Sequence, residues 1–275
     1  MTQIWETGSL EGQCGYRVTG AGPAVLLVHG FPFDGSIWMH TAGTLSSGFR
    51  VIIPDLAAWG LSKRLPLPAT LDGLADQVYQ VLVREQAGPA VLFGHSLGGY
   101  VVLSLAARYP DAFLGIGLVH STAEADSPGK RDGRVRAMEM IRSQGSLPYL
   151  EQMIPSLFSA TFALRHPDIL EKLIRQFGGI DPKLLLGYQQ IMLERPDRCQ
   201  VLKQARVPVL FAAGKLDPVV PPDAILPQMG LPRVASILWM EEAAHMGMYE
   251  SPDELEQSLN GFAGFCFNHR FEVNL

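Results

Sequence analysis

The chain has few cysteines and no clustered positive charge. Its 275 residues include only Cys14, Cys199 and Cys266, which lie far apart with no C-x-x-C spacing. An odd number of isolated cysteines argues against a disulfide framework and favours free thiols in a reducing cytoplasm. Lys and Arg number 22 against 27 Asp and Glu. The densest basic stretch, residues 130–136, is interrupted by Asp132. We interpret it as the solvated face of a helix and expect no nucleic-acid partner.

The sequence also lacks long apolar segments and the usual metal and cofactor motifs. No apolar run approaches the roughly 18 residues that a membrane span requires. The first 17 residues contain Glu6 and Glu11 and no continuous apolar stretch, so we expect no signal peptide and no membrane partner. There is no H-E-x-x-H, no paired Cys/His cluster and no G-x-G-x-x-G after an apolar run. We therefore expect neither a metal ion nor a cofactor.

Short apolar runs alternate with helical patterns along most of the chain. Each run is apolar throughout, which is typical of parallel strands buried on both faces. A more alternating segment, Gln13–Val18, predicts an antiparallel edge strand. The fold class is therefore α/β, with a mostly parallel sheet and helices on both faces. The runs are Ala24–His29, Phe49–Pro54, Ala90–Gly94, Leu114–Val119, Val207–Ala213 and Val234–Met240.

The alternation stops between residues 124 and 205, where no strand pattern is found. Four amphipathic patterns predict helices over Arg131–Gln144, Pro148–Phe158, Pro167–Phe177 and Pro182–Leu193. We interpret residues 124–205 as a helical cap inserted between two strands. Residues 1–123 and 206–275 would then form one core domain around the sheet.

One short motif carries chemistry. Gly94-His95-Ser96-Leu97-Gly98 directly follows an apolar run and directly precedes a helical pattern. The G-x-S-x-G pattern serves a strained strand-to-helix turn that exposes the serine hydroxyl. Glycines two residues to either side remove the Cβ atoms that would collide where the chain doubles back. The pattern is weak by itself, and its context makes Ser96 a candidate nucleophile.

Further motifs in the same order make the chain resemble the α/β-hydrolase family, in particular its small bacterial serine carboxylesterases and enol-lactonases. His29-Gly30-Phe31-Pro32 follows a predicted strand and is similar to the family's oxyanion-hole loop. The segment from Asp55 to Ser62 is similar to the family's D-x-x-G-x-G-x-S turn. It departs at Ala58, where the family has glycine. The resemblance covers nearly the whole chain.

The resemblance implies which residues accompany Ser96. The family places its base between the last strand and the last helix, and His245 is the one histidine in that position. The family's chain order of nucleophile, acid and base then points to Asp217 as the acid that orients the imidazole. Some relatives place the acid after the preceding strand, where Glu124 and Asp126 are the alternatives.

The resemblance also implies an oxyanion hole formed by the backbone N–H groups of Phe31 and Leu97. Pro32 has no N–H and cannot contribute one. His29 is expected to brace this loop, whereas His120 is a candidate lining residue of the pocket. Trp59 is a second candidate for that lining.

The implied activity is hydrolysis of a carboxylic ester through an acyl-enzyme on Ser96. The cap is rich in Leu, Met and Phe, which suits small and rather apolar ester substrates. A lactone or enol-lactone hydrolase uses the same residues and is the alternative within the enzyme class. A ligand receptor that retains these three residues with negligible turnover is the alternative from another class. The sequence leaves the oligomeric state open.

Overall fold

The structure, a computed structural model, describes residues 5–8 and 14–269. Its centre is an eight-stranded sheet with strand order β1-β2-β4-β3-β5-β6-β7-β8. The strands from β3 to β8 pair in parallel, whereas β1 and β2 are antiparallel to their neighbours. The predicted α/β fold class is confirmed. The strands are β1 (Glu6–Gly8), β2 (Tyr16–Thr19), β3 (Ala24–Val28), β4 (Arg50–Pro54), β5 (Ala90–His95), β6 (Phe113–Val119), β7 (Val209–Gly214) and β8 (Ala235–Met240).

Two details at the sheet edges differ from the predictions. The segment predicted over Gln13–Val18 forms β2, which is antiparallel, but the three-residue β1 pairs outside it and is the edge strand. Gln13 itself lies outside the described residues. β8 forms as predicted but is not buried on both sides, because it is the last strand of the sheet, and half of the Ile237 side chain is exposed.

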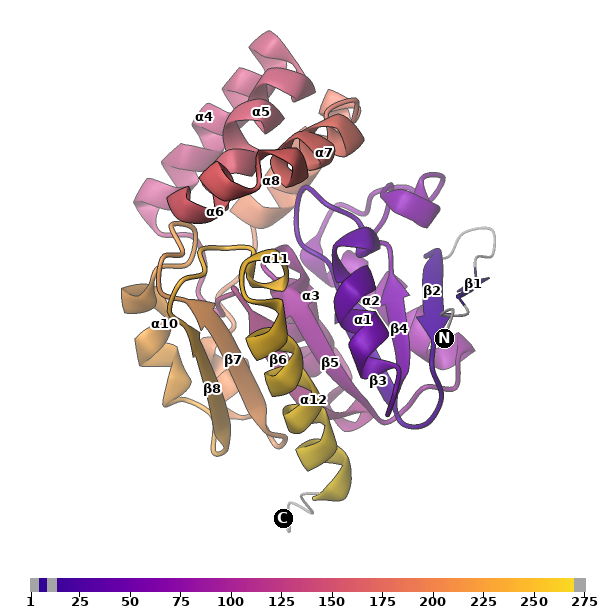
Figure 1. Cartoon of the computed structure of the whole chain (residues 1–275). Coiled ribbons are helices and arrows are strands. Elements are labelled where there is room, and N and C mark those ends of the chain that lie inside the picture. The colour runs from indigo at the N-terminus through magenta and orange to yellow at the C-terminus, as the bar shows by residue number, and fades with distance from the viewer. Residues whose placement is uncertain (1–4, 9–13, 270–275) are drawn as a thin grey trace.

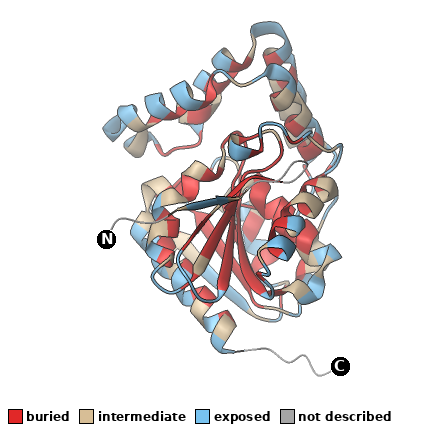
Figure 2. Cartoon of the chain, turned by 90° about the vertical axis from the view of Figure 1, so that its right-hand side faces the viewer, coloured by how far each residue is buried: buried red, intermediate tan, exposed pale blue. Residues whose placement is uncertain are grey.

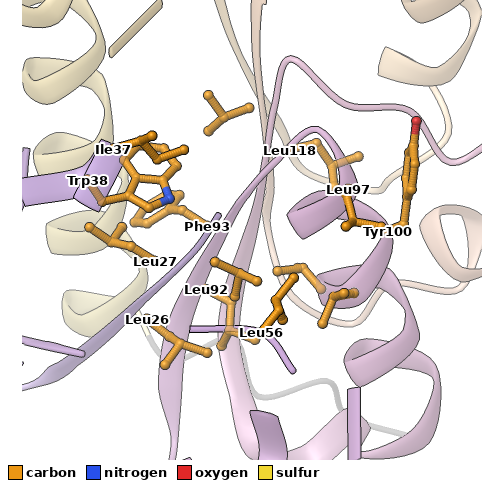
Figure 3. Close-up of a cluster of buried hydrophobic side chains, with 14 of the residues drawn as sticks. Leu26, Leu27, Ile37, Trp38, Leu56, Leu92, Phe93, Leu97, Tyr100 and Leu118 are labelled. Atoms are coloured by element: carbon orange, nitrogen blue, oxygen red, sulfur yellow. The ribbon is translucent and has the colours of Figure 1, made fainter. Parts of the chain in front are cut away.

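Helices cover both faces of the sheet (Figure 1). α2 and α3 pack together on one face, where α3 contacts β3, β5 and β6, whereas α1 and α12 pack together on the other. Successive residues of a strand therefore point to opposite faces of the sheet and pack into two hydrophobic layers. Figure 3 shows Leu27 and Phe93 near Trp38, and Leu92 and Leu118 toward Leu97. Outside the segment between β6 and β7, the helices are α1 (Met39–Leu45), α2 (Leu71–Arg84), α3 (Leu97–Arg108), α10 (Pro222–Met229), α11 (Gly247–Glu250) and α12 (Pro252–Asn268), with 3-10 turns η1 (Gly35–Trp38), η2 (Gly60–Ser62) and η3 (Pro110–Ala112).

A group of helices lies between β6 and β7 in the chain and sits over one end of the sheet (Figures 1 and 2). We refer to residues 124–205 as the insertion. Its four predicted helices form, and two short ones, α6 and α9, were not predicted. With six and five residues, α6 and α9 are too short to show a helical period in the sequence. The helices are α4 (Pro128–Gln144), α5 (Ser146–Ser156), α6 (Ala160–Arg165), α7 (Pro167–Phe177), α8 (Pro182–Leu193) and α9 (Cys199–Lys203).

Aromatic contacts join the insertion to the sheet domain. Tyr188 of α8 donates a hydrogen bond from its hydroxyl to the Ala57 carbonyl at 2.7 Å. The Tyr188 ring lies 5.7 Å from the ring of Trp59 and 6.2 Å from that of Phe31. Phe177 of α7 packs edge-on against Phe33 with ring centroids 5.4 Å apart. These buried contacts hold the insertion against the loops that follow β3 and β4.

The turn after β4 keeps its geometry although Ala58 replaces the expected glycine. Ala58 adopts φ +64°, the left-handed conformation that glycine enters without steric cost. The fully buried Asp55 carboxylate accepts hydrogen bonds from Gly35 N at 2.7 Å and Leu61 N at 2.6 Å, and pairs with Arg17 at 2.9 Å. This carboxylate therefore ties the turn to β2 and to the loop after β3.

Within the part of the chain that the structure describes, no helix is both long enough and apolar enough to cross a bilayer. All three cysteines are free, with Cys14 and Cys266 buried and Cys199 partly buried. Burial raises the pKa of Cys14 and of Cys266 to about 12. Neither of these two thiols is an ionised nucleophile at neutral pH.

Candidate active site

Ser96 occupies a strained turn between β5 and α3. Its backbone adopts φ +50° and ψ −115°, a conformation that non-glycine residues rarely enter. A Cβ atom on Gly94 would lie 2.2 Å from the Gly98 carbonyl oxygen, and one on Gly98 would lie 2.3 Å from the Val28 carbonyl oxygen. Both glycines of the motif are therefore required sterically. Ser96 is partly exposed while its neighbours on both sides are buried.

His245 and Asp217 form a buried imidazole–carboxylate pair. His245 lies on the loop between β8 and α11, and its Nδ1 is 2.8 Å from Oδ2 of Asp217, which follows β7. The other carboxylate oxygen accepts the N–H groups of Val219 at 2.8 Å and Val220 at 2.9 Å. Burial acts to raise the pKa of Asp217, but electrostatic attraction to His245 and hydrogen bonds from His120 and His245 outweigh this effect and lower the pKa. The carboxylate is therefore ionised at neutral pH.

His120, at the end of β6, is a second histidine bound to the same carboxylate. Its Nδ1 lies 3.2 Å from Oδ2 of Asp217, and its Nε2 accepts the N–H of Gly247 at 3.1 Å. Because Nε2 accepts, the neutral ring carries its proton on Nδ1 and donates it to Asp217. Burial lowers the pKa of His120 and keeps the ring neutral. His120, which the sequence offered as a candidate lining residue, does not line the cavity, because it lies buried beside Asp217 and Gly247.

The loop that carries His245 is held at several points. The His245 N–H donates to the Leu157 carbonyl of the insertion at 2.9 Å, and His95 Nε2 donates to the His245 carbonyl at 2.9 Å. Glu250 accepts the N–H groups of Ala244 and Met246 on one oxygen. Its other oxygen accepts the Ser159 N–H at 2.7 Å, which again reaches the insertion. His245 is thus positioned by the loops around the sheet and by the insertion together.

The two backbone N–H groups predicted for the oxyanion hole belong to Phe31, in the loop after β3, and to Leu97, at the start of α3. Leu97 is the first residue of α3, where backbone N–H groups have no partner within the helix. Among the loop hydrogen bonds of the described residues, neither Leu97 nor Phe31 donates its N–H. His29 braces the Phe31 loop: its Nε2 accepts the Leu56 N–H at 2.9 Å, and its Nδ1 lies 3.1 Å from the Gly30 carbonyl.

A cavity of about 300 Å³ brings the candidate residues together. It is lined by Phe31, Ser96 and His245 from the sheet domain. Met153, Leu157 and Met192 are among the residues that the insertion contributes. Ser96 and His245 thus face one space, although no direct hydrogen bond joins their side chains. In ligand-free hydrolases this bond is often loose and tightens when substrate binds.

The insertion also contributes charge to this cavity, which corrects one interpretation from sequence. Lys130 and Arg134 were interpreted as part of a solvated helix face, yet both line the cavity. Asp126, an alternative acid, lines it too, but its carboxylate binds Arg134 and Arg195 rather than a histidine. Glu124, the other alternative, is exposed to solvent. Trp59 is absent from the lining because it is buried among aromatic side chains.

Two other features of the described residues offer no comparable chemistry. A larger hollow of about 650 Å³ lies where β6 and β7 begin and contains none of the candidate residues. His120, Asp217 and His245 are close enough together to bind a metal ion. However, Nδ1 of His120 carries the proton that it donates to Asp217, so it offers no lone pair to a metal. The three residues form a hydrogen-bonded group.

The comparison with known proteins agrees with this geometry. The model of the alpha/beta hydrolase family matches residues 25–258. The chain belongs to this family. A pimeloyl-(acyl-carrier protein) methyl ester esterase from Vibrio cholerae belongs to the curated relatives, and it is 26% identical over 254 residues, which cover 90% of this chain and 97% of the relative.

Solved structures of similar proteins include an esterase and an enol-lactonase. A thermophilic esterase from Thermogutta terrifontis, solved with malate bound, has a TM-score of 0.86 at 30% identity and covers 97% of this chain and 99% of its own. The enol-lactonase from Burkholderia xenovorans has a TM-score of 0.84 at 22% identity, with 94% and 99% covered. At that identity the second likeness concerns the fold alone. Family membership and these relatives support ester hydrolysis in general terms.

Several residues that support or line the candidate site could not be identified from the sequence. The position of His120 at the end of a strand, at the same edge of the sheet as Asp217, could have indicated the contact between them. No sequence feature points to the role of Glu250, because an acidic residue before a helix is common. Lys130 and Arg134 had a misleading signal, because alternating charges usually mark a solvated face.

Proposed function

We propose that the protein hydrolyses carboxylic esters of small molecules through an acyl-enzyme on Ser96. One observation carries this proposal. The Asp217 carboxylate accepts hydrogen bonds on both oxygens and lies against Nδ1 of His245, and His245 shares one cavity with the strained Ser96. With its proton on Nδ1, the neutral imidazole has a lone pair on Nε2. That lone pair is what a serine hydroxyl needs in order to become a nucleophile near neutral pH.

In the first half of the reaction, Ser96 Oγ attacks the ester carbonyl carbon and its proton passes to His245 Nε2. The N–H groups of Phe31 and Leu97 bind the negative oxygen of the tetrahedral intermediate. Asp217 stays ionised and stabilises the imidazolium. The intermediate then collapses, and the leaving alkoxide takes the proton from His245 and departs as the alcohol.

In the second half, a water molecule attacks the acyl carbon while His245 accepts its proton. Collapse of the second intermediate releases the carboxylic acid and returns the proton to Ser96. The insertion acts as a cap in this scheme: residues 124–205 form the distal wall of the cavity and hold the base through Leu157 and Ser159. A lactone is a cyclic ester and would be opened by the same steps.

The proposal is tested with p-nitrophenyl acetate and butyrate. The wild type should release many equivalents of p-nitrophenol per chain, whereas a receptor with negligible turnover would release at most about one. Ser96→Ala should lower kcat by roughly 10⁴ to 10⁶-fold, because the nucleophile is removed. Ser143→Ala, on the exposed side of α4, is the matched control and should behave as the wild type. Retained turnover in a folded Ser96→Ala protein would overturn the proposal.

We also propose a cytoplasmic location. The three cysteines are free, and an oxidising compartment would favour disulfides or loss of accessible thiols. Cell fractionation should recover the activity with the cytoplasmic fraction, and thiol titration of the unfolded protein should count all three cysteines. Recovery in an extracytoplasmic fraction would contradict this location.

A further inference from the structure

The wall that the insertion contributes to the cavity contains more positive than negative charge. Asp126 is fully buried and lies 2.6 Å from a guanidinium nitrogen of Arg195 and in contact with Nε of Arg134. Arg195 is also almost fully buried, and its guanidinium stacks 4.1 Å from the centre of the Tyr100 ring. One carboxylate therefore balances two guanidinium groups.

Lys130 adds a third positive charge to this group and, like Arg134 but unlike Arg195, lines the cavity. Among the described residues, no carboxylate lies within 4 Å of its ammonium group, and no hydrogen bond engages it. It also lies in the first turn of α4, where the helix dipole is positive and disfavours a cation. Burial, together with the charge of Arg195, lowers the pKa of Lys130. The ammonium is thus placed where it is energetically unfavourable in the absence of an anion.

Further hydrogen-bond donors accompany Lys130. The Tyr149 hydroxyl accepts a hydrogen bond from Gln189 Nε2 at 2.8 Å, which leaves its O–H free to donate. Arg134 donates from Nε to Asp126 and from one terminal nitrogen to Gln189, so the N–H groups of its other terminal nitrogen remain available to a ligand. Lys130, Arg134 and Tyr149 all line the cavity that contains Ser96 and His245.

We propose that Lys130, supported by Arg134 and Tyr149, binds a carboxylate on the substrate, so that the preferred esters carry a free carboxylate at a short distance from the scissile bond. This inference rests on the proposed ester hydrolysis and specifies its substrate class. An isolated charge in a partly buried wall is costly, and a substrate carboxylate supplies the missing counter-charge. The apolar lining from Met153, Leu157 and Met192 suits the short carbon chain between the two groups.

Two pairs of esters of matched size test the preference and locate the carboxylate. Monoethyl glutarate is compared with ethyl valerate, which places the charge on the acyl side. 4-Acetoxybutanoate is compared with butyl acetate, which places it on the alcohol side. Acid release is followed in a pH-stat at low salt. In at least one pair, kcat/KM for the anionic ester should exceed that for the neutral ester by about tenfold, the size expected for a hydrogen bond to a charged group.

Variants assign the preference to Lys130. Lys130→Met should lower the ratio of anionic to neutral kcat/KM by about tenfold, chiefly through KM, and Lys130→Arg should restore most of it. Lys172→Met is the matched control, because it removes the same charge from an exposed position on α7. It should leave the ratio unchanged. An equal loss on both esters in Lys130→Met, or the same ratio in all four proteins, would overturn the inference.

A binding measurement separates this inference from the proposed function. Ser96→Ala protein is titrated with glutarate and with the neutral glutaramide in a calorimeter. The inference predicts that glutarate binds more tightly than glutaramide, and that Lys130→Met in the same background removes the difference. This result would stand even if no ester were hydrolysed, in which case only the proposed function would fail. Equal affinity for the two ligands, with or without Lys130, would contradict the carboxylate site.

Discussion

The carboxyl edge of the sheet and the helical insertion contribute to the cavity in different ways. At the edge, the candidate residues are restrained by local geometry: Ser96 by a turn that requires two glycines, and Asp217 by hydrogen bonds to both oxygens. In the insertion, Lys130 and Arg134 extend from one face of α4, and Arg134 is restrained by side-chain contacts with Asp126 and Gln189.

This difference leads us to attribute the reaction to the edge of the sheet and the choice of ester to the insertion. Strand ends place a few atoms accurately, since neighbouring strands and loops restrain them on several sides. A helix presents long side chains whose identity can change without disturbing the sheet. We therefore expect substitutions at the edge to act on kcat, and substitutions in the insertion to act on stability and on which ester is preferred.

Two of the buried carboxylates, Asp217 and Asp126, provide the strongest test of this comparison. Asp217→Asn should lower kcat by about 10⁴-fold, because an amide no longer favours the imidazole tautomer with its proton on Nδ1. Asp126→Asn should change kcat by less than about tenfold, yet lower the free energy of unfolding by about 3 kcal/mol, because two guanidinium groups lose their counter-charge. Esterase kinetics and urea unfolding measure both effects. A larger loss of kcat in Asp126→Asn than in Asp217→Asn would contradict the comparison.

A smaller effect on turnover is expected at His120, which acts through Asp217 without lining the cavity. His120→Ala should lower kcat by about tenfold to a hundredfold, because Asp217 and the Gly247 loop lose a shared partner and the base shifts. His120→Asn keeps a donor toward Asp217 and should retain more activity than His120→Ala. KM should change little in either variant. Wild-type kinetics in His120→Ala would show that Asp217 is sufficiently oriented without it.

Buried histidines should also make the folded state less stable in mild acid. Burial lowers the pKa of His29, His95 and His120 below the ordinary value of a histidine. Below about pH 6.5 the unfolded chain binds protons at these positions while the folded chain does not, so stability falls as the pH falls. Each histidine contributes up to about 1.4 kcal/mol per pH unit in that range.

Urea midpoints at pH 7.5 and pH 5.5 check this expectation. The midpoint should be lower at pH 5.5, and the decrease should be smaller in His120→Asn than in the wild type. His166→Asn is the control variant, since it replaces the one histidine of the insertion at an exposed position. A midpoint that is equal at both pH values would contradict the assignment of three neutral buried histidines.

The smallest effect concerns Ala58 in the turn after β4. Ala58→Gly should raise the free energy of unfolding by about 0.5–1 kcal/mol, because glycine adopts φ +64° without steric cost. Ala57→Gly is the control: Ala57 is buried and its φ is not positive, so this change should destabilise by about 1 kcal/mol. Thermal unfolding of the two variants measures the expected gain in stability from Ala58→Gly and the expected loss from Ala57→Gly. Destabilisation by Ala58→Gly would mean that the alanine methyl group contributes packing that exceeds the strain.

The sequence predicts the edge better than the insertion for a physical reason. Ser96 lies in a turn whose sterics demand particular residues, and His245 follows from the motif order of the family. The structure joins His245 to Asp217 as expected. The role of Ser96 and His245 as nucleophile and base stays a prediction, since their side chains share a cavity without a direct hydrogen bond.

Helical periodicity also predicted four of the helices in the insertion, three of them with proline near the start. It did not reveal which face of α4 turns toward the cavity, because charged residues suit either solvent or a ligand. Hence Lys130 and Arg134 were interpreted as solvated. The short α6 and β1 were missed because neither is long enough to show a period.

Stoichiometric labelling tests the central claim most directly. The protein is treated with diethyl p-nitrophenyl phosphate, and released p-nitrophenol, remaining esterase activity and the modified peptide are measured together. The account predicts about one equivalent released per chain, activity lost in proportion, diethyl phosphate on Ser96, and no reaction in His245→Ala. Complete inactivation with Ser96 unmodified, or a fully labelled Ser96 in an enzyme that still hydrolyses esters, would contradict it.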